Sequence, residues 1–107
     1  MGKPEAVVED YLIERVKVLG GQQRKLKWVG RDGAPDRLVW FEFPAVGVIE
    51  VKRDRTVGPR GVLRAAQVRE INGMRAAGWP VYIVESRYDV DEALRAIMCC
   101  IPVSDVL

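Results

Sequence analysis

The stretch VGVIEVK, residues 46–52, decides the fold of this chain. Apolar residues occupy both alternating faces of the run, which is the pattern of a central β-strand buried on both sides. Its end nevertheless carries a carboxylate and an ammonium group, those of Glu50 and Lys52. Because strand side chains alternate, these two groups point to one face, about 6.5 Å apart along the strand. Buried charges require partners, so the stretch predicts a charged site at the end of a buried strand.

A second acid precedes this strand. Asp36 opens another apolar run, residues 37–43, which we expect to pair with residues 47–52 as a hairpin. An aspartate in this position can simply cap the turn before a strand, but the hairpin would bring it beside Glu50. Metal-dependent phosphodiester cleavage uses two acids and a lysine in this way: the acids bind a hard cation through oxygen and the lysine orients the attacking water.

The composition excludes several other chemistries. At 107 residues the chain is long enough for one domain with a single core. Histidine is absent, which excludes Ser-His-Asp and Cys-His hydrolases, histidine-ligated metal nucleases and histidine-based phosphotransfer. No Walker A phosphate loop is present, so we expect no nucleotide cofactor. Any hydrolysis must rest on carboxylates, lysine and a bound metal.

The cysteines and tryptophans favour plain packing roles. Cys99 and Cys100 are adjacent, so they rarely form a disulfide with sound geometry, and they lack the partners of a zinc site. We expect them to be reduced core residues of a cytoplasmic protein. No apolar run approaches the about 20 residues needed to span a bilayer, and the N-terminus does not read as a signal peptide. Trp40 and Trp79 are expected in core or dimer packing rather than in base stacking, whereas Trp28, on the basic segment 23–29, is left open between the two.

The charge of the chain is concentrated in its middle. The net charge is only +2, but residues 24–75 carry twelve basic and six acidic side chains, a local +6. This distribution suggests one positive face around the site, although solvated charges with no preferred side would give the same counts. The candidate phosphate contacts are Arg24, Lys25 and Lys27, and, in the Gly- and Pro-containing loop 53–61, Arg53, Arg55 and Arg60.

Periodicity and turn residues predict an α/β fold of the order α-β-β-β-α-β-α. The apolar stripe and the flanking Pro and Gly residues predict the first helix, and alternation and turn signals predict the strands. The expected helices are residues 4–19, 62–77 and 90–100, the last capped by Asp89 or Asp91. The expected strands are residues 23–29, 37–43, 47–52 and 79–85.

Two helices carry a polar residue on an apolar stripe. Glu9 shares a face with Leu12 and Val16, and Gln67 shares one with Leu63 and Ile71. A glutamate at this place is usually a boundary residue, and an inward amide can simply satisfy a neighbouring backbone group.

These features resemble the PD-(D/E)xK nuclease superfamily, whose motif appears as Pro35-Asp36 followed by Glu50-Val51-Lys52. The flanking residues narrow the resemblance to a stand-alone VRR-NUC domain of viral or bacterial type. The matching segments are Glu9 to Leu12, Val18 to Gly21, Gly33 to Val39, Glu50 to Lys52, and Gln67. The resemblance implies a single domain over residues 1–107 with a restriction-endonuclease-like core, a mixed β-sheet flanked by helices.

The resemblance also implies roles for these residues. Glu9, Asp36 and Glu50, with the carbonyl of Val51, would hold Mg²⁺ or Mn²⁺, and Glu5 is the rival of Glu9 for the helix ligand. Lys52 would orient the attacking water, and Gln67 would support the site by contacting the lysine, the water or a phosphate. Oxygen-only ligation fits a hard cation rather than zinc.

The implied activity is metal-dependent DNA endonuclease cleavage in a bacterial or phage-infected cell. The chain resembles no helix-turn-helix or zinc-finger reader, so structure-selective cutting is expected rather than sequence-specific cutting. A short chain has little surface for branched DNA, and a homodimer would present two sites to a four-way junction. The alternatives are a flap or single-strand nuclease of the same chemistry, or a non-catalytic nucleic-acid-binding module.

Overall fold

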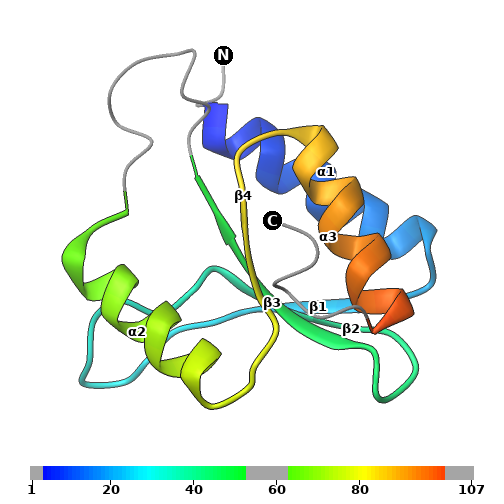
Figure 1. The fold of residues 1–107 in the computed structure, drawn as a ribbon. Coiled ribbons are helices and arrows are strands. Elements are labelled where there is room, and N and C mark those ends of the chain that lie inside the picture. The colour runs from blue at the N-terminus through cyan, green and yellow to red at the C-terminus, as the bar shows by residue number, and fades with distance from the viewer. Residues whose placement is uncertain (1–3, 53–62, 101–107) are drawn as a thin grey trace.

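The computed structural model describes residues 4–52 and 63–100, with side chains described from residue 6 onward. Within these ranges the order of elements is the predicted α-β-β-β-α-β-α (Figure 1). The elements are α1 (Pro4–Val18), β1 (Gln22–Lys25), β2 (Arg37–Trp40), β3 (Val46–Val51), α2 (Ala65–Ala76), β4 (Val81–Val84) and α3 (Arg87–Cys99). The predicted α/β class with a mixed sheet is therefore confirmed.

The described strands form one sheet in the order β1-β2-β3-β4. The pairs β1–β2 and β2–β3 are antiparallel, as expected for strands joined by short connections, whereas β3 and β4 are parallel. A parallel pair requires a crossover connection, and α2 provides it. The crossover leaves β3 between two neighbours, so the strand that carries Glu50 is central.

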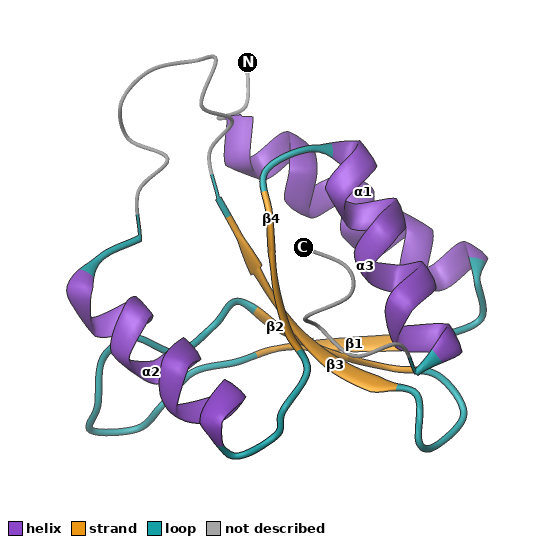
Figure 2. Cartoon of the chain, in the orientation of Figure 1, coloured by secondary structure: helices purple, strands orange, loops and turns teal. Residues whose placement is uncertain are grey.

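Helices cover both faces of the sheet (Figure 2). On one face α1 and α3 enclose the larger core, to which β3 contributes Ile49 and Val51. On the other face α2 covers a smaller cluster, built on Val48, Ile71 and Val81. Successive residues of β3 thus alternate between two apolar layers, as the two-faced pattern of the sequence predicts. By the same alternation Glu50 and Lys52 belong to the α2 face.

Several predicted boundaries differ from the structure. β1 ends at Lys25 instead of reaching residue 29, because its partner β2 begins at Arg37, which pairs with Lys25. α3 begins at Arg87, three residues earlier than expected, because Ser86 is the cap: its Oγ accepts a hydrogen bond from the backbone N–H of Asp89 at 3.1 Å. Asp89 in turn accepts from the backbone N–H of Glu85 at 2.9 Å.

The prediction that the cysteines lie in the core is wrong. Cys99 and Cys100 are free and exposed. The buried face of α3 is formed by Val90, Ala93, Leu94, Ala96 and Ile97. Cys99 is out of phase with that face, and Cys100 follows the end of the helix in the left-handed conformation, with φ of 56°.

The three tryptophans are only partly buried. Trp28 and Trp40 are half-buried, while Trp79 is 47% exposed. Among the described helices, none has the length and apolar character required to cross a membrane.

Candidate active site

The site is built where β2 begins and β3 ends. In the β2–β3 ladder Arg37 pairs with Ile49, so the next residues of the same register, Asp36 and Glu50, lie opposite each other. Directly opposed residues share a face and have Cβ atoms about 4.5–5.5 Å apart. The ladder stops here, and the Asp36 Oδ2 atom instead accepts a hydrogen bond from the backbone N–H of Val51 at 2.6 Å. The two predicted acids are therefore brought side by side.

Glu50 is held in the sheet from the α2 side. Its side chain is 1% exposed, which places a carboxylate in the interior beside the apolar cluster of α2. Gln67 on α2 donates a hydrogen bond from Nε2 to Glu50 Oε2 at 2.7 Å, while Gln67 Oε1 accepts from the backbone N–H of Arg64 at 3.0 Å. The contact that the structure shows for Gln67 is thus with an acid, and the same amide caps the start of α2.

Lys52 immediately follows β3. Its backbone N–H donates to the carbonyl of Val84 at 2.7 Å, which continues the pairing with β4 by one residue. The residue is 7% exposed, so its long side chain is largely buried on the face that Glu50 also occupies. Asp36, Glu50, Lys52 and Gln67 consequently converge on the α2 face at one end of β3.

The loop before Asp36 is fastened to α2. Arg31 donates from Nε and Nη2 to the two carboxylate oxygens of Glu70, at 2.9 and 2.7 Å, and this bidentate contact holds the pKa of Glu70 below its usual value. Gly33 has φ of +96°, and a Cβ atom there would lie 2.5 Å from the carbonyl oxygen of Ala66. The loop that presents Asp36 and the helix that presents Gln67 are therefore packed backbone to backbone.

Glu9 lies on α1, over the face of the sheet opposite to the one that Asp36 and Glu50 share. It is half-buried on α1, with its neighbour Asp10 exposed. Its Oε2 accepts a hydrogen bond from Arg37 Nε at 3.1 Å, and Arg37 Nη1 donates to Gln23 Oε1 at 2.7 Å. The sequence analysis assigns no role to Arg37, although this residue ends the Gly-x-Pro-Asp-Arg segment. The signal that could have predicted its contacts is its position directly after Asp36. The rival ligand Glu5 lies outside the residues with described side chains.

The donors available to a metal are all oxygens. Within residues 4–52 and 63–100, no three Asp, Glu, His or Cys side chains lie close enough together to form a metal-binding group. Asp36 and Glu50 are adjacent, and the carbonyl of Val51 stands at the same strand end. Mg²⁺ is commonly bound by one or two carboxylates together with water and substrate phosphates. The set fits a hard divalent cation, and a ligand role for Glu9 stays a prediction.

The predicted DNA contacts on β1 divide between two faces. Arg24 pairs with Leu38 in the ladder, so it lies on the α2 face, and its guanidinium stands 5.1 Å from the centroid of the Trp40 ring. Lys25 alternates to the other face, and Lys27 is exposed beyond the strand. The sheet thus shows basic groups along its β1 edge rather than on one face. The other candidates, Arg53, Arg55 and Arg60, lie outside the described residues.

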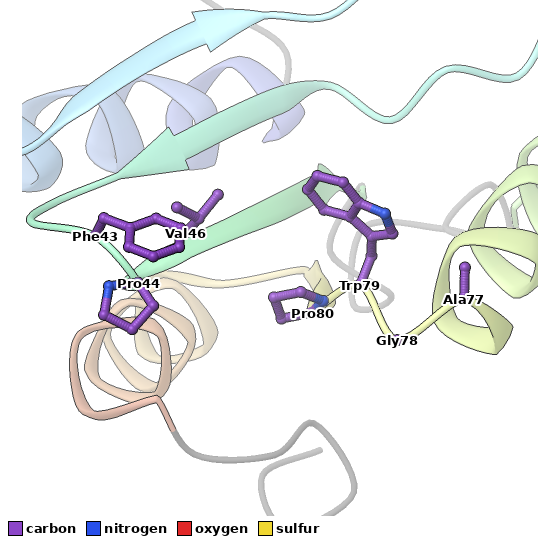
Figure 3. Close-up of a pocket in the computed structure, with 7 residues that line it drawn as sticks. All are labelled: Phe43, Pro44, Val46, Ala77, Gly78, Trp79 and Pro80. Carbon is purple, nitrogen blue, oxygen red and sulfur yellow. The ribbon is translucent and has the colours of Figure 1, made fainter.

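An apolar hollow lies at the other end of β3. It has a volume of about 390 Å³ and is lined by the residues shown in Figure 3: Phe43, Pro44, Val46, Ala77, Gly78, Trp79 and Pro80. Val46 begins β3, whereas Glu50 and Lys52 lie at its end. The hollow contains no acid or lysine, so it is separate from the polar site in both position and chemistry.

The sequence and fold of this chain are similar to those of a known domain. A solved structure described as "VRR_NUC domain" aligns with a TM-score of 0.76 and 36% sequence identity, and the alignment covers 88% of this chain and 97% of that chain. No family model and no curated protein matches the chain. The two aligned chains are alike over most of their lengths.

Proposed function

This chain belongs to the VRR-NUC family of nuclease domains, and we propose that it is a metal-dependent endonuclease that hydrolyses phosphodiester bonds in branched DNA. One observation carries the proposal: Asp36 and Glu50 stand opposite each other on the face shared by Lys52 and Gln67. A buried carboxylate is costly unless it is well partnered, and Glu50 at 1% exposure is maintained in the interior. Such an arrangement is typical of a site rather than of packing.

The metal we propose is Mg²⁺ or Mn²⁺, held by Asp36, Glu50 and the Val51 carbonyl, with Glu9 as a further ligand. The chain has no histidine, and the donors at the strand end are oxygens, which suits these hard cations. When bound, the cation would polarise the scissile phosphate and make a water molecule more acidic. The remaining work falls to the chain's own side chains.

Each side chain has a separate task. The Val51 N–H anchors one oxygen of Asp36, and the Gln67 amide anchors one oxygen of Glu50, so both carboxylates keep fixed directions. The Lys52 ammonium donates hydrogen bonds to the attacking water and sets its direction for in-line displacement. Because Lys52 is largely buried, its charge acts on the reacting atoms with less screening than a surface lysine would experience.

We propose a four-way junction as the substrate and a symmetric homodimer as the active form. Two copies of this domain would present two sites across the two-fold axis of a junction. The basic β1 edge, with Arg24, Lys25 and Lys27, and the loop arginines Arg53, Arg55 and Arg60 would contact phosphates. Such contacts give affinity that falls with salt but little sequence preference.

A substrate panel tests the proposal. Purified protein is incubated with a four-way junction, a flap, a linear duplex and a single strand, with Mg²⁺ or Mn²⁺ and then with EDTA. We expect paired, symmetric cuts in the junction that EDTA abolishes. If the flap or the single strand is cut in preference to the junction, that DNA is the substrate and the four-way junction is not. If the protein binds DNA but cleaves none of the substrates under any metal condition, the remaining function is that of a non-catalytic nucleic-acid-binding module.

Sedimentation of the protein with and without DNA tests the dimer. A monomer at all concentrations would contradict the junction-resolving dimer, whatever the substrate panel shows.

A further inference from the structure

Arg37 connects three elements at the end of the sheet where the acids lie. It is the first residue of β2 and follows Asp36 directly. Strand alternation turns its side chain away from Asp36, toward the face that α1 covers. There the guanidinium donates to Glu9 on α1 and to Gln23 on β1. Its side chain is only 15% exposed and that of Glu9 is 26% exposed, so the pair is mostly withdrawn from solvent.

The other contacts of α1 with the sheet are of a different kind. Val8, Leu12 and Val16 enter the apolar core, and apolar packing is not directional. These residues press the helix against the sheet, but they do not fix the direction of a carboxylate. A guanidinium is a rigid planar fork, and hydrogen bonds to two different acceptors, Glu9 and Gln23, fix the orientation of the fork itself. The oriented fork therefore holds one oxygen of the Glu9 carboxylate, Oε2, at a defined place.

Arg37 donates a hydrogen bond to only one of the two oxygens of the Glu9 carboxylate. The hydrogen bond reaches Glu9 Oε2, and Glu9 Oε1 has no hydrogen-bond partner within residues 4–52 and 63–100. A carboxylate anchored through one oxygen can offer its second oxygen to a cation or to a water. Metal ligands are commonly oriented by such a neighbour, and removing that neighbour lowers metal affinity about 10–100-fold.

We propose that Arg37 is a positioning residue that acts through Glu9, setting the carboxylate of α1 toward the strand-end acids Asp36 and Glu50. This inference rests on the proposed function, because it takes Glu9 to serve the metal. The removal of Arg37 would also remove a positive charge near the cation, which by itself would tighten metal binding. The loss of orientation is the larger effect, so the net change is weaker binding.

A double-mutant cycle on the full chain tests the inference. Mn²⁺ affinity is measured by calorimetry for wild type, Arg37→Met, Glu9→Gln and the double variant, and urea unfolding without metal reports the fold. We expect Arg37→Met to weaken Mn²⁺ binding about tenfold or more. In the Glu9→Gln background the same change should have less than about a threefold effect, because residues that act as a unit are not additive.

Kinetics and two further variants sharpen the result. Arg37→Met should lower kcat and leave KM for DNA nearly unchanged, and Arg37→Lys should not restore kcat, because an ammonium lacks the fork. Gln23→Leu removes the second acceptor and should weaken Mn²⁺ binding in the same direction, which keeps the test available if Arg37→Met fails to fold. Arg95→Met, which breaks an exposed Arg–Glu pair on α3, is the matched control and should change nothing.

Several results would overturn the inference. Equal effects of Arg37→Met in both backgrounds would show that it does not act through Glu9. Unchanged or tighter Mn²⁺ binding would make Arg37 a mere counter-ion, and a raised, salt-sensitive KM would make it a phosphate contact. Cleavage by the wild-type protein is scored separately, so an active enzyme with an additive cycle refutes this inference while leaving the proposed function intact. A wild-type protein that binds no Mn²⁺ would refute both.

Discussion

Gly33 lies in the loop before Asp36, and replacing it with alanine should weaken the packing of that loop against α2. Gly33 has φ of +96°, and the added Cβ atom would lie 2.5 Å from the Ala66 carbonyl oxygen and 2.7 Å from its carbonyl carbon. Both atoms are backbone atoms of α2, so relief requires the helix or the loop to move. The left-handed conformation costs an alanine about 1–2 kcal/mol, and an overlap in a packed region adds about 1–3 kcal/mol. We expect a total loss of about 2–5 kcal/mol in the free energy of unfolding.

Gly30→Ala in the same loop is the matched control. Gly30 also has a positive φ, +74°, but a Cβ atom there meets nothing within 4 Å. Gly30→Ala should therefore lower the free energy of unfolding only by the cost of the left-handed backbone conformation. Alanine also stabilises the protein by restricting the unfolded chain, but this contribution is the same in both variants. The difference between the two variants isolates the contact with α2 and should be at least about 1 kcal/mol, by the overlap cost given above.

Urea unfolding measures both variants, and cleavage assays follow. Because the loop presents Asp36 and α2 presents Gln67, a displaced Gly33 loop should also reduce cleavage, whereas Gly30→Ala should leave it close to wild type. If the two variants differ by less than about 0.5 kcal/mol in stability, at the limit of additivity errors, the contact does not constrain the loop. In that case the account of how Asp36 is held is wrong.

Three further predictions concern the site and the helix pair. Lys52→Ala should reduce cleavage about 10²–10³-fold, the usual loss when one positioned hydrogen-bond donor is removed from the reacting atoms. Its Mn²⁺ affinity by calorimetry should stay within a few-fold of wild type, and an unchanged cleavage rate would refute the role of Lys52. Asp36→Ala or Glu50→Ala should remove Mn²⁺ binding and cleavage together, and wild-type affinity in both would contradict the ligand assignment. Tyr11 donates a hydrogen bond to Asp91 at 2.8 Å, and this bond raises the pKa of the tyrosine from 10.0. The stability advantage of wild type over Tyr11→Phe, measured by urea unfolding, should therefore be complete below about pH 10 and fall as the pH rises further. A stability difference that does not change with pH would show that the bond does not hold the hydroxyl.

The sequence predicts the parts of the fold that depend on local pattern. The two-faced run at residues 46–52 identifies β3, and Asp36 before an apolar run predicts the hairpin that sets it opposite Glu50. The end of β1 was beyond such reasoning, because its alternating residues continue to Val29 while pairing lasts only as far as β2 extends. Strand length here is set by the partner, not by the strand itself.

Contacts between elements distant in sequence were the hardest to predict. The pair of Arg37 and Glu9 depends on how α1 is rotated against the sheet, which no periodicity determines. The bidentate contact between Arg31 and Glu70 depends likewise on where α2 lies. The apolar character of Cys99 suggested burial, but the phase and the end of α3 decided its exposure.

The position of Asp36 explains why the acids stand where the sheet ends. If β2 extended one residue further, Asp36 would be held by strand pairing alone. Because the ladder stops at Arg37 and Ile49, the Asp36 carboxylate takes the place of a strand carbonyl and accepts the Val51 N–H. The same carboxylate therefore ends the pairing and orients itself beside Glu50. Alternation sends Arg37 to the opposite face, toward α1, where it contacts Glu9. Both faces of the sheet would contribute to one site only with Glu9 as the further metal ligand that we propose.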